Sequence, residues 1–233
     1  DTGIIVEPGV VNDGVGKFVK DIIDVVPDSD DFEKSLLNSG AEILINLLPV
    51  GSDEAVKFYA QSAINTKVGF INCIPVFIAR DETWYNKFRE NNVPLIGDDI
   101  KSQVGATIVH RVLAQLFSDR GVKLKNTYQL NVGGNMDFLN MLEEDRLETK
   151  RTSKTSSVTS VANNGKGIDP DNVRIGPSDY VKWLEDKKKA FIRLEGESFG
   201  GAPLNIEVQL EVWDSPNSAG VTIDAVRYMK FFA

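Results

Sequence analysis

The stretch from Asn131 to Val158 gathers residue types that bind or react rather than fill a core. It reads NVGGNMDFLNMLEEDRLETKRTSKTSSV, with amides, carboxylates and lysines but little apolar periodicity. Gly133 and Gly134 permit close backbone approach or a positive φ. Asn135 and Asp137 add an amide and a carboxylate just before a helical pattern. This composition predicts a binding or catalytic site.

Two lysines in the same stretch, Lys150 and Lys154, stand four residues apart. On a helix they would share one face and repel each other by a few tenths of a kcal/mol, about 0.5, unless an anion lies between them. A phosphorylated substrate would supply that anion. The alternative is that these lysines, like the basic cluster at 182 and 187–189, belong to solvated faces.

Composition restricts the classes of protein and of partner. A net charge of −8 and a pI near 4.8 argue against a general nucleic-acid surface. The single cysteine, Cys73, excludes an internal disulfide framework and fits a reducing cytoplasm. The first residues lack the features of a signal peptide, and no apolar run is long enough to span a membrane. We therefore expect a cytoplasmic protein without nucleic-acid or membrane partners.

The only histidine, His110, leaves little material for a histidine metal site or a Ser-His-Asp triad. It lies in the helical pattern TIVHRVLAQLF, which favours a helix-surface or core role over catalysis.

The elements that position these residues alternate in the first half of the chain. Apolar runs predict strands at 42–48, 68–74 and 93–97, and amphipathic patterns predict helices at 52–66 and 81–91, the first capped by Ser52. This order predicts an α/β fold with a doubly wound parallel sheet, whose ligands bind beyond the carboxyl ends of the strands.

The pattern changes after an amphipathic helix expected at about 101–120. A strand, TYQLNV, then leads into the glycine and asparagine segment. Residues 161–172 are a polar connector, and the alternating segments 191–199 and 204–213 predict a hairpin with one apolar face. That face is expected to pack on helices or on another subunit.

Four blocks of the sequence resemble one family, the inositol-3-phosphate synthases, also called myo-inositol-1-phosphate synthases, and within it the short prokaryotic branch. The blocks are GDDIKSQVGAT (97–107), LNVGGNMDFLNM (130–141), SKTSSV (153–158) and EVWDSPNSAGV (211–221). Their order and spacing agree with the family over essentially the whole chain.

One motif expected of a dinucleotide fold is missing. No GxGxxG turn follows a buried strand, and the glycines of 9–16 do not qualify as that turn. The resemblance implies an internal fragment without the first βα unit and without a C-terminal segment that supplies a further lysine. It implies a partial NAD-binding, Rossmann-like domain over 1–122, an α+β catalytic and oligomerisation domain over 123–213, and a helix over 214–233 that returns to the first domain.

The resemblance also implies an activity. The family converts D-glucose 6-phosphate to 1D-myo-inositol 3-phosphate by oxidation at C5, enolisation, intramolecular aldol closure and reduction at C5, with a tightly held NAD. Members differ on whether a divalent or monovalent cation assists, and they commonly form homotetramers. An NAD-dependent sugar-phosphate dehydrogenase would share the wound sheet but release NADH. A non-catalytic sugar-phosphate or NAD binding module would keep the lysines without turnover, and it gains weight if these residues are the whole protein.

Site residues follow from the resemblance by matching motif positions. The residues matched to catalytic positions are Lys150, Lys154, Lys188, Asn135, Asp137, Asp186 and Asp214. Those matched to cofactor positions are Asp99, Ser102, Asp214 and Ser215, and no metal ligands are assigned. The lysines are expected to stabilise negative charge on substrate oxygens and the phosphate.

Several of these residues also have plain structural explanations. Asp99 and Ser102 could simply begin a helix, and Asp214 could form a turn after a strand. A lysine Schiff base is another conceivable chemistry, although the resemblance favours enolate chemistry without one.

Overall fold

The structure, a computed structural model, describes residues 3–26, 31–143 and 148–232, except for the side chains at 148–151, 177 and 178. The chain divides into two compact units. The first comprises Asp1–Ile100 and Asp224–Ala233, and the second comprises Lys101–Ile223. Each unit is described by itself.

A parallel sheet forms the centre of the first unit. Its strands are β1 (Ile43–Asn46), β2 (Gly69–Asn72) and β3 (Leu95–Ile96), in the order β1-β2-β3. The helices in sequence are α1 (Phe32–Asn38), α2 (Asp53–Thr66) and α3 (Glu82–Glu90). The parallel pairing and the alternation of strands and helices confirm the α/β prediction.

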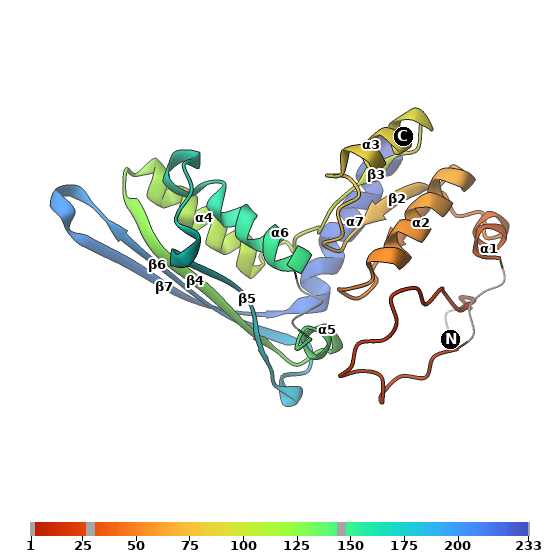
Figure 1. Cartoon of the computed structure of the whole chain (residues 1–233), viewed down its shortest axis with the longest axis horizontal. Helices are drawn as coiled ribbons and strands as arrows, with labels where there is room; N and C mark the ends of the chain where they lie inside the picture. Colours follow the sequence, from red (N-terminus) through yellow and green to blue (C-terminus); the bar gives the residue numbers. More distant parts are fainter. Residues whose placement is uncertain (1–2, 27–30, 144–147, 233) are drawn as a thin grey trace. The chain divides into compact units, whose positions relative to one another are not determined.

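Helices cover both faces of this sheet (Figure 1). Phe70 of β2 packs with Val56 of α2 and Phe88 of α3. Its neighbour Ile71 packs instead with Met229, in the last turns of the long helix α7 (Asp214–Phe232). Because successive side chains of a strand point to opposite faces, an uninterrupted apolar run is what a sheet covered on both faces requires.

The start of α2 differs from the prediction in its capping residue. Ser52 occupies the N-cap position, but its side chain makes no capping hydrogen bond. The carboxylate of Asp13 accepts instead from the backbone N–H groups of Glu54 and Ala55, both at 2.8 Å. The glycine-containing segment 9–16 therefore contributes the cap of α2 from a distant part of the chain.

A four-stranded mixed sheet forms the centre of the second unit. Strand β4 pairs in parallel with β5 and antiparallel with β6, and β6 and β7 form the predicted antiparallel hairpin. The strands, in the order β5-β4-β6-β7, are β4 (Lys123–Gly133), β5 (Val173–Tyr180), β6 (Lys187–Glu197) and β7 (Pro203–Trp213).

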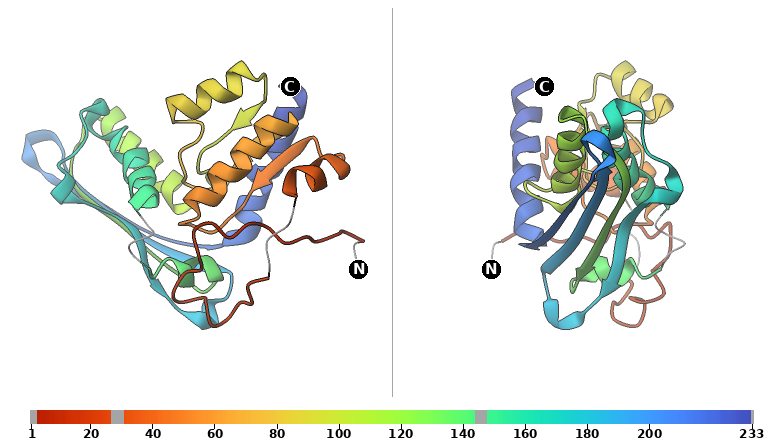
Figure 2. Two further views of the ribbon diagram at one scale, coloured as in Figure 1. Left: turned by 45° about the vertical axis from the view of Figure 1, so that its right-hand side comes forward. Right: turned by 90° about the vertical axis from the view of Figure 1, so that its left-hand side faces the viewer.

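Helices α4 (Ala106–Asp119) and α6 (Glu148–Thr159) lie along one face of this sheet, as Figures 1 and 2 show from several sides. Phe117 of α4 packs in one core with Leu124 of β4 and Leu194 of β6. Other described elements of this unit are the short α5 (Met136–Asn140), the beginning of α7, and 3-10 turns at Ala162–Gly165, Pro170–Asn172, Lys182–Leu184 and Phe199–Gly201.

The division into units does not follow the expected boundary at 122. Helix α4 groups with residues 101–223 because its apolar side packs on β4 and β6. At the other end, α7 begins at Asp214, and its residues from Asp224 onward group with the first unit.

None of the helices in the described part of the chain combines the length and the apolar character needed to cross a bilayer.

Candidate functional site

The site begins at the end of β4, where two glycines allow unusually close packing. A Cβ on Gly133 would lie 2.4 Å from the ring of Phe138, and one on Gly134 would lie 2.4 Å from the backbone nitrogen of Glu185. Space, rather than a left-handed backbone, is therefore why glycine is needed at both positions. This packing brings the start of α5 against the segment that precedes β6.

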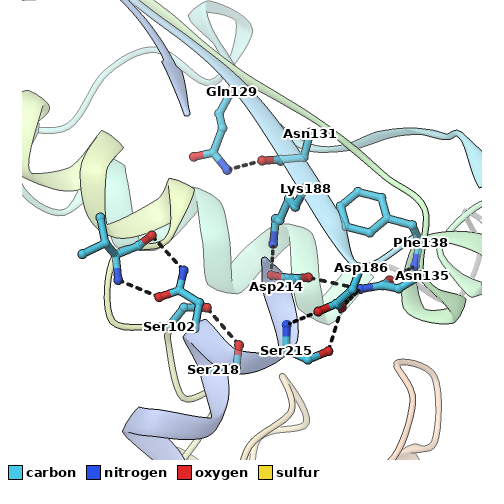
Figure 3. A network of polar contacts seen from close by, with 12 residues as sticks. Ser102, Gln129, Asn131, Asn135, Phe138, Asp186, Lys188, Asp214, Ser215 and Ser218 are labelled. Atoms are coloured by element: carbon cyan, nitrogen blue, oxygen red, sulfur yellow. Dashed lines mark hydrogen bonds and ion pairs between the residues drawn. The ribbon is translucent and has the colours of Figure 1, made fainter. Parts of the chain in front are cut away.

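Asn135 uses both ends of its side-chain amide. Its Oδ1 caps α5 by accepting from the backbone N–H of Phe138 at 3.1 Å. Its Nδ2 donates to Asp186 Oδ1 at 3.4 Å and to Asp214 Oδ2 at 3.5 Å. The helix cap fixes the orientation of the amide, so its N–H groups point at two carboxylates from other elements (Figure 3).

Lys188 and Asp214 form a partly buried ion pair. Lys188 Nζ lies 3.2 Å from Asp214 Oδ1, and the two side chains are 20% and 16% exposed. The ammonium also lies 5.6 Å from the centre of the Phe138 ring. One face of this cation is therefore apolar, which reduces its contact with water and strengthens its field.

Asp186 anchors the first turn of α7. It accepts from Ser215 Oγ at 2.7 Å and from Ser215 N at 3.1 Å, and its backbone carbonyl accepts from Asp214 N at 2.9 Å. A carboxylate at a helix N-terminus also interacts favourably with the helix dipole. The residues brought together are thus Asn135, Asp186, Lys188, Asp214 and Ser215, all of them predicted site residues (Figure 3).

Helix α6 carries the other two predicted lysines. Their spacing places Lys150 and Lys154 on one face of the helix, as predicted. Lys154 is only 8% exposed, whereas the side chain of Lys150 lies outside the described residues. The preceding residue, Ser153, accepts a hydrogen bond from Lys101 Nζ at 3.2 Å. Lys101 was not singled out from the sequence.

The remaining predicted residues, Asp137, Ser102 and Asp99, belong to other segments of the chain. Asp137 lies in the first turn of α5. Ser102 shares a hydrogen bond with Ser218 of α7, with 3.0 Å between the hydroxyl oxygens. Asp99 belongs to the first unit, in a left-handed backbone conformation with φ of 55°.

Asn217 is a further residue that the sequence did not single out. Its side chain pairs with the backbone of Val104, accepting from the nitrogen at 3.1 Å and donating to the carbonyl at 2.9 Å. Its own carbonyl accepts from Gln103 N at 3.1 Å. This pairing holds the segment before α4 against the start of α7. Asparagine between proline and serine, in SPNS, was the only signal in the sequence.

A second polar network is buried under α4. Its side chains, each at most 4% exposed, run from Asn131 through Gln129 and His110 to Thr127. Asn131 Nδ2 donates to the carbonyl of Gly176 at 2.7 Å, and Gln129 Nε2 donates to Asn131 Oδ1 at 3.1 Å (Figure 3).

The imidazole of His110 closes this network. Its Nδ1 lies 3.3 Å from Gln129 Oε1, and its Nε2 lies 2.6 Å from Thr127 Oγ1, which donates to the carbonyl of Arg193 at 2.7 Å. Burial lowers the pKa of His110 to about 4, and the hydrogen bond that the protonated ring makes with Gln129 opposes that shift. His110 is thus a core histidine, as the sequence favoured.

In the part of the chain that the structure describes, no three His, Cys, Asp or Glu side chains are grouped so as to hold a metal ion. The described side chains of the candidate site offer a lysine ammonium group, carboxylates and an amide.

Comparisons with known proteins agree with this architecture. Residues 105–215 match the sequence profile of the family described as myo-inositol-1-phosphate synthase. An inositol-3-phosphate synthase of Mycolicibacterium smegmatis is 58% identical over 98% of this chain and 64% of its own length. The chain thus spans somewhat less than two thirds of that relative.

Two solved structures are also similar. A myo-inositol-1-phosphate synthase-related protein of Thermotoga maritima is 27% identical with a TM-score of 0.72, over 86% of this chain and 57% of that one. An inositol-3-phosphate synthase of Caenorhabditis elegans shares the fold with a TM-score of 0.79, at 18% identity over 94% of this chain and 50% of that one.

The fold and the site define a class of protein in which a Rossmann-like parallel sheet is combined with a mixed sheet that presents a lysine and carboxylate cluster. Within that class, the chain belongs to the myo-inositol-1-phosphate synthase family.

Proposed function

We propose that the whole protein converts D-glucose 6-phosphate to 1D-myo-inositol 3-phosphate through oxidation at C5, enolisation, intramolecular aldol closure and reduction at C5. The observation that carries the proposal is the cluster of Lys188, Asp214, Asn135 and Asp186, which assembles residues matched to the family's catalytic positions. The 58% identity to a named inositol-3-phosphate synthase supports it.

In this proposal Lys188 stabilises negative charge that develops on a substrate oxygen. Of the three N–H donors of its ammonium group, one points at the carboxylate of Asp214. Another N–H can therefore donate to the substrate. The neighbouring Phe138 ring limits water around the ammonium, and in such surroundings a positioned charge acts more strongly than in bulk water.

Lys154 and Lys150 act from helix α6 on the substrate's oxygens or phosphate. Lys154 is almost fully buried, and a charge in surroundings with little water acts more strongly on a nearby substrate anion than it would in bulk water. The phosphate would also remove the repulsion between two lysines that share one helix face.

NAD, when bound, would supply the acceptor and donor of a hydride for the oxidation and reduction at C5 of the sugar. The carboxyl edge of the parallel sheet in the first unit is the kind of edge at which dinucleotides bind. The residues that would hold NAD are Asp99, Ser102, Asp214 and Ser215. The hydroxyls of Ser102 and Ser215 already have partners within the chain, but each keeps acceptor capacity for a ligand.

We also propose that the protein self-associates, as a homotetramer, through the outer face of the mixed sheet. Phe191 of β6 and Trp213 of β7 are 39% and 53% exposed on the side away from α4 and α6. Leu130 of β4 lies directly opposite Phe191 in the strand register. The other side chains of β6 and β7 on this face are mainly charged or polar, so these large exposed apolar side chains stand out and mark a candidate interaction surface.

The experiment that tests the proposed reaction follows the hydrogen at C5. Glucose 6-phosphate labelled with deuterium at C5 is incubated with the full-length protein and NAD, and the inositol phosphate is analysed by mass spectrometry. We expect the deuterium to be retained, because the hydride leaves and returns within one turnover. Loss of the label to NADH or water would contradict the internal oxidation and reduction.

A further inference from the structure

A buried polar cluster lies at the carboxyl ends of the three strands of the parallel sheet. Asn46 ends β1, Asn72 ends β2, and Asp98 follows β3; they are 4%, 0% and 8% exposed. Asn46 Nδ2 donates to Asn72 Oδ1 at 2.8 Å, and Asn72 Nδ2 donates to Asp98 Oδ1 at 2.8 Å. The three side chains therefore form one connected network across the edge of the sheet.

Asp98 accepts hydrogen bonds from a whole loop. Its Oδ2 accepts from the backbone N–H groups of Ile78 at 2.9 Å and Arg80 at 3.1 Å, and its Oδ1 accepts from Ala79 N at 3.0 Å. With the amide of Asn72, four donors converge on one carboxylate, about as many as it has lone pairs to offer. Asp98 is therefore occupied by the chain itself, and we give it no direct contact with a ligand.

The same place joins the loop after β2 to the loop after β3. Asn72 Nδ2 donates to the carbonyl of Val76 at 2.7 Å, and the backbone N–H of Asp99 donates to the carbonyl of Ile74 at 3.1 Å. A Cβ on Gly97 would lie 3.1 Å from Asn72 Cβ, so a larger residue there would push the two strand ends apart. Asp98 and its neighbours thus fix the backbone on both sides of the edge.

We propose that Asp98 is a positioning residue for the dinucleotide, holding residues 76–80 and Asp99 in the conformation that binds NAD before NAD arrives. The inference rests on the proposed function, because it takes NAD as the ligand of this edge. Parallel α/β sheets bind ligands beyond their carboxyl ends. A rim that is ordered in advance does not lose conformational freedom on binding, which increases affinity.

The test compares two variants of the full-length protein, Asp98→Asn and Asp81→Asn. The first replaces a carboxylate acceptor by an amide whose NH₂ group faces backbone N–H donors. The control changes an exposed carboxylate that caps α3 by accepting from Trp84 N at 3.0 Å. NAD affinity is measured by calorimetry, and hydrogen exchange is followed at the amides of Ile78, Ala79 and Arg80.

We expect Asp98→Asn to speed exchange at these three amides and to weaken NAD binding by about tenfold or more, with kcat near the wild-type value at saturating NAD. Asp81→Asn should leave NAD affinity unchanged within about twofold, because its effect is confined to a helix cap. Unchanged NAD affinity in Asp98→Asn despite faster exchange would overturn the proposal, as would equal weakening by both variants.

A second measurement needs only the wild-type protein and applies if Asp98→Asn does not fold. The amides of 78–80 should be protected from exchange before NAD is added. Ready exchange that stops only on addition of NAD would show that the rim is not ordered in advance, and the proposal would fail. A wild-type protein that does not bind NAD at all would instead contradict the proposed function.

Discussion

Lys188 is the cation on which the proposed chemistry depends most visibly, because its ion pair with Asp214 and its contact with Phe138 fix its position. We predict that Lys188→Ala lowers kcat by about a hundredfold or more, the effect typical of removing a positioned charge that acts on a developing oxyanion. Steady-state kinetics of product formation, with a thermal unfolding curve for the same protein, would measure it.

Lys182→Ala is the matched control. Lys182 is an exposed lysine close in sequence to Lys188, in the 3-10 turn before β6. Its removal should change kcat little, as surface substitutions usually do. Near-normal turnover in Lys188→Ala would remove that lysine from the site, and an equal loss in both variants would point to a general charge effect.

The hydrogen bonds around His110 predict which of its two ring nitrogens carries the proton. The hydrogen-bonded network around His110 ends at two backbone carbonyls, those of Gly176 and Arg193, which can only accept. The NH₂ groups of Asn131 and Gln129 and the hydroxyl of Thr127 therefore donate toward these carbonyls and away from the imidazole. Both imidazole nitrogens consequently face oxygen atoms that act as acceptors. A neutral imidazole carries one N–H, and the longer contact, 3.3 Å to Gln129 Oε1, is the one that lacks the proton. We expect the Nε2–H tautomer, which nitrogen NMR of the single histidine would identify.

The buried imidazole of His110 also makes the stability of the folded protein depend on pH. Burial lowers the pKa of His110 from 6.5 to about 4. Between these two pH values the imidazole is therefore protonated in the unfolded chain but still neutral in the folded chain. The free energy of unfolding should therefore fall as the pH falls through this window, by about 3 kcal/mol in total. Urea unfolding at several pH values would measure it.

His110→Gln isolates this contribution from that of the carboxylates. The variant should lose the part of the slope that lies between pH 6.5 and 4, whatever its stability at pH 7. Identical slopes, or an imidazole that titrates near 6.5 in the folded protein, would contradict the assignment.

At the scale of residues, the sequence predicts roles that depend on a local motif better than roles that depend on a partner far away in the chain. Asn135, Lys188 and Asp214 were assigned to the candidate site through their residue types within matched motifs. Asp98, Lys101 and Asn217 were not, because their roles depend on partners that only the fold brings close, such as Ser153 for Lys101 and Val104 for Asn217. Judged by residue type alone, Asp98, Lys101 and Asn217 could equally be solvent-exposed residues of loops.

At the scale of elements, the turn between β4 and α5 leaves no room for a side chain at its glycines. A Cβ on Gly134 would lie 2.4 Å from Glu185 N and 2.6 Å from Val181 O, both backbone atoms that cannot rotate away. We predict that Gly134→Ala destabilises the protein by about 1–3 kcal/mol, seen as a lower unfolding temperature, and reduces activity by displacing Asn135.

Gly176→Ala on the neighbouring strand β5 is the control for this substitution. A Cβ there would meet no atom of the described residues within 4 Å. The variant should be close to wild type in both stability and activity. Equal stability of the two variants would show that close packing at Gly134 is not what shapes the turn.

The elements themselves were largely predictable. Apolar runs identified the three parallel strands, and strict alternation identified the hairpin of β6 and β7, because buried and half-buried strands differ in periodicity. The cap of α2 was not predictable, because Asp13 reaches it from outside the local sequence. The grouping of α4 depends on which sheet its apolar side meets, which periodicity does not encode.

At the scale of the whole molecule, the outer face of the mixed sheet predicts self-association. Phe191→Glu places a charge beside Leu130 in the middle of that face, so we expect it to dissociate the assembly into smaller species in sedimentation. Phe199→Glu is the control, because Phe199 is fully exposed in the turn between the two hairpin strands. A monomeric wild-type protein, or an intact assembly in Phe191→Glu, would contradict the proposed interface.

The most direct test of the central claim is phosphorus NMR of glucose 6-phosphate incubated with the full-length protein and NAD, while absorbance follows NADH. The proposed reaction predicts an inositol phosphate signal that grows with time and no accumulation of NADH. Stoichiometric NADH with an oxidised sugar phosphate would show a plain dehydrogenase instead, and a folded protein that leaves the substrate unchanged would contradict catalysis altogether.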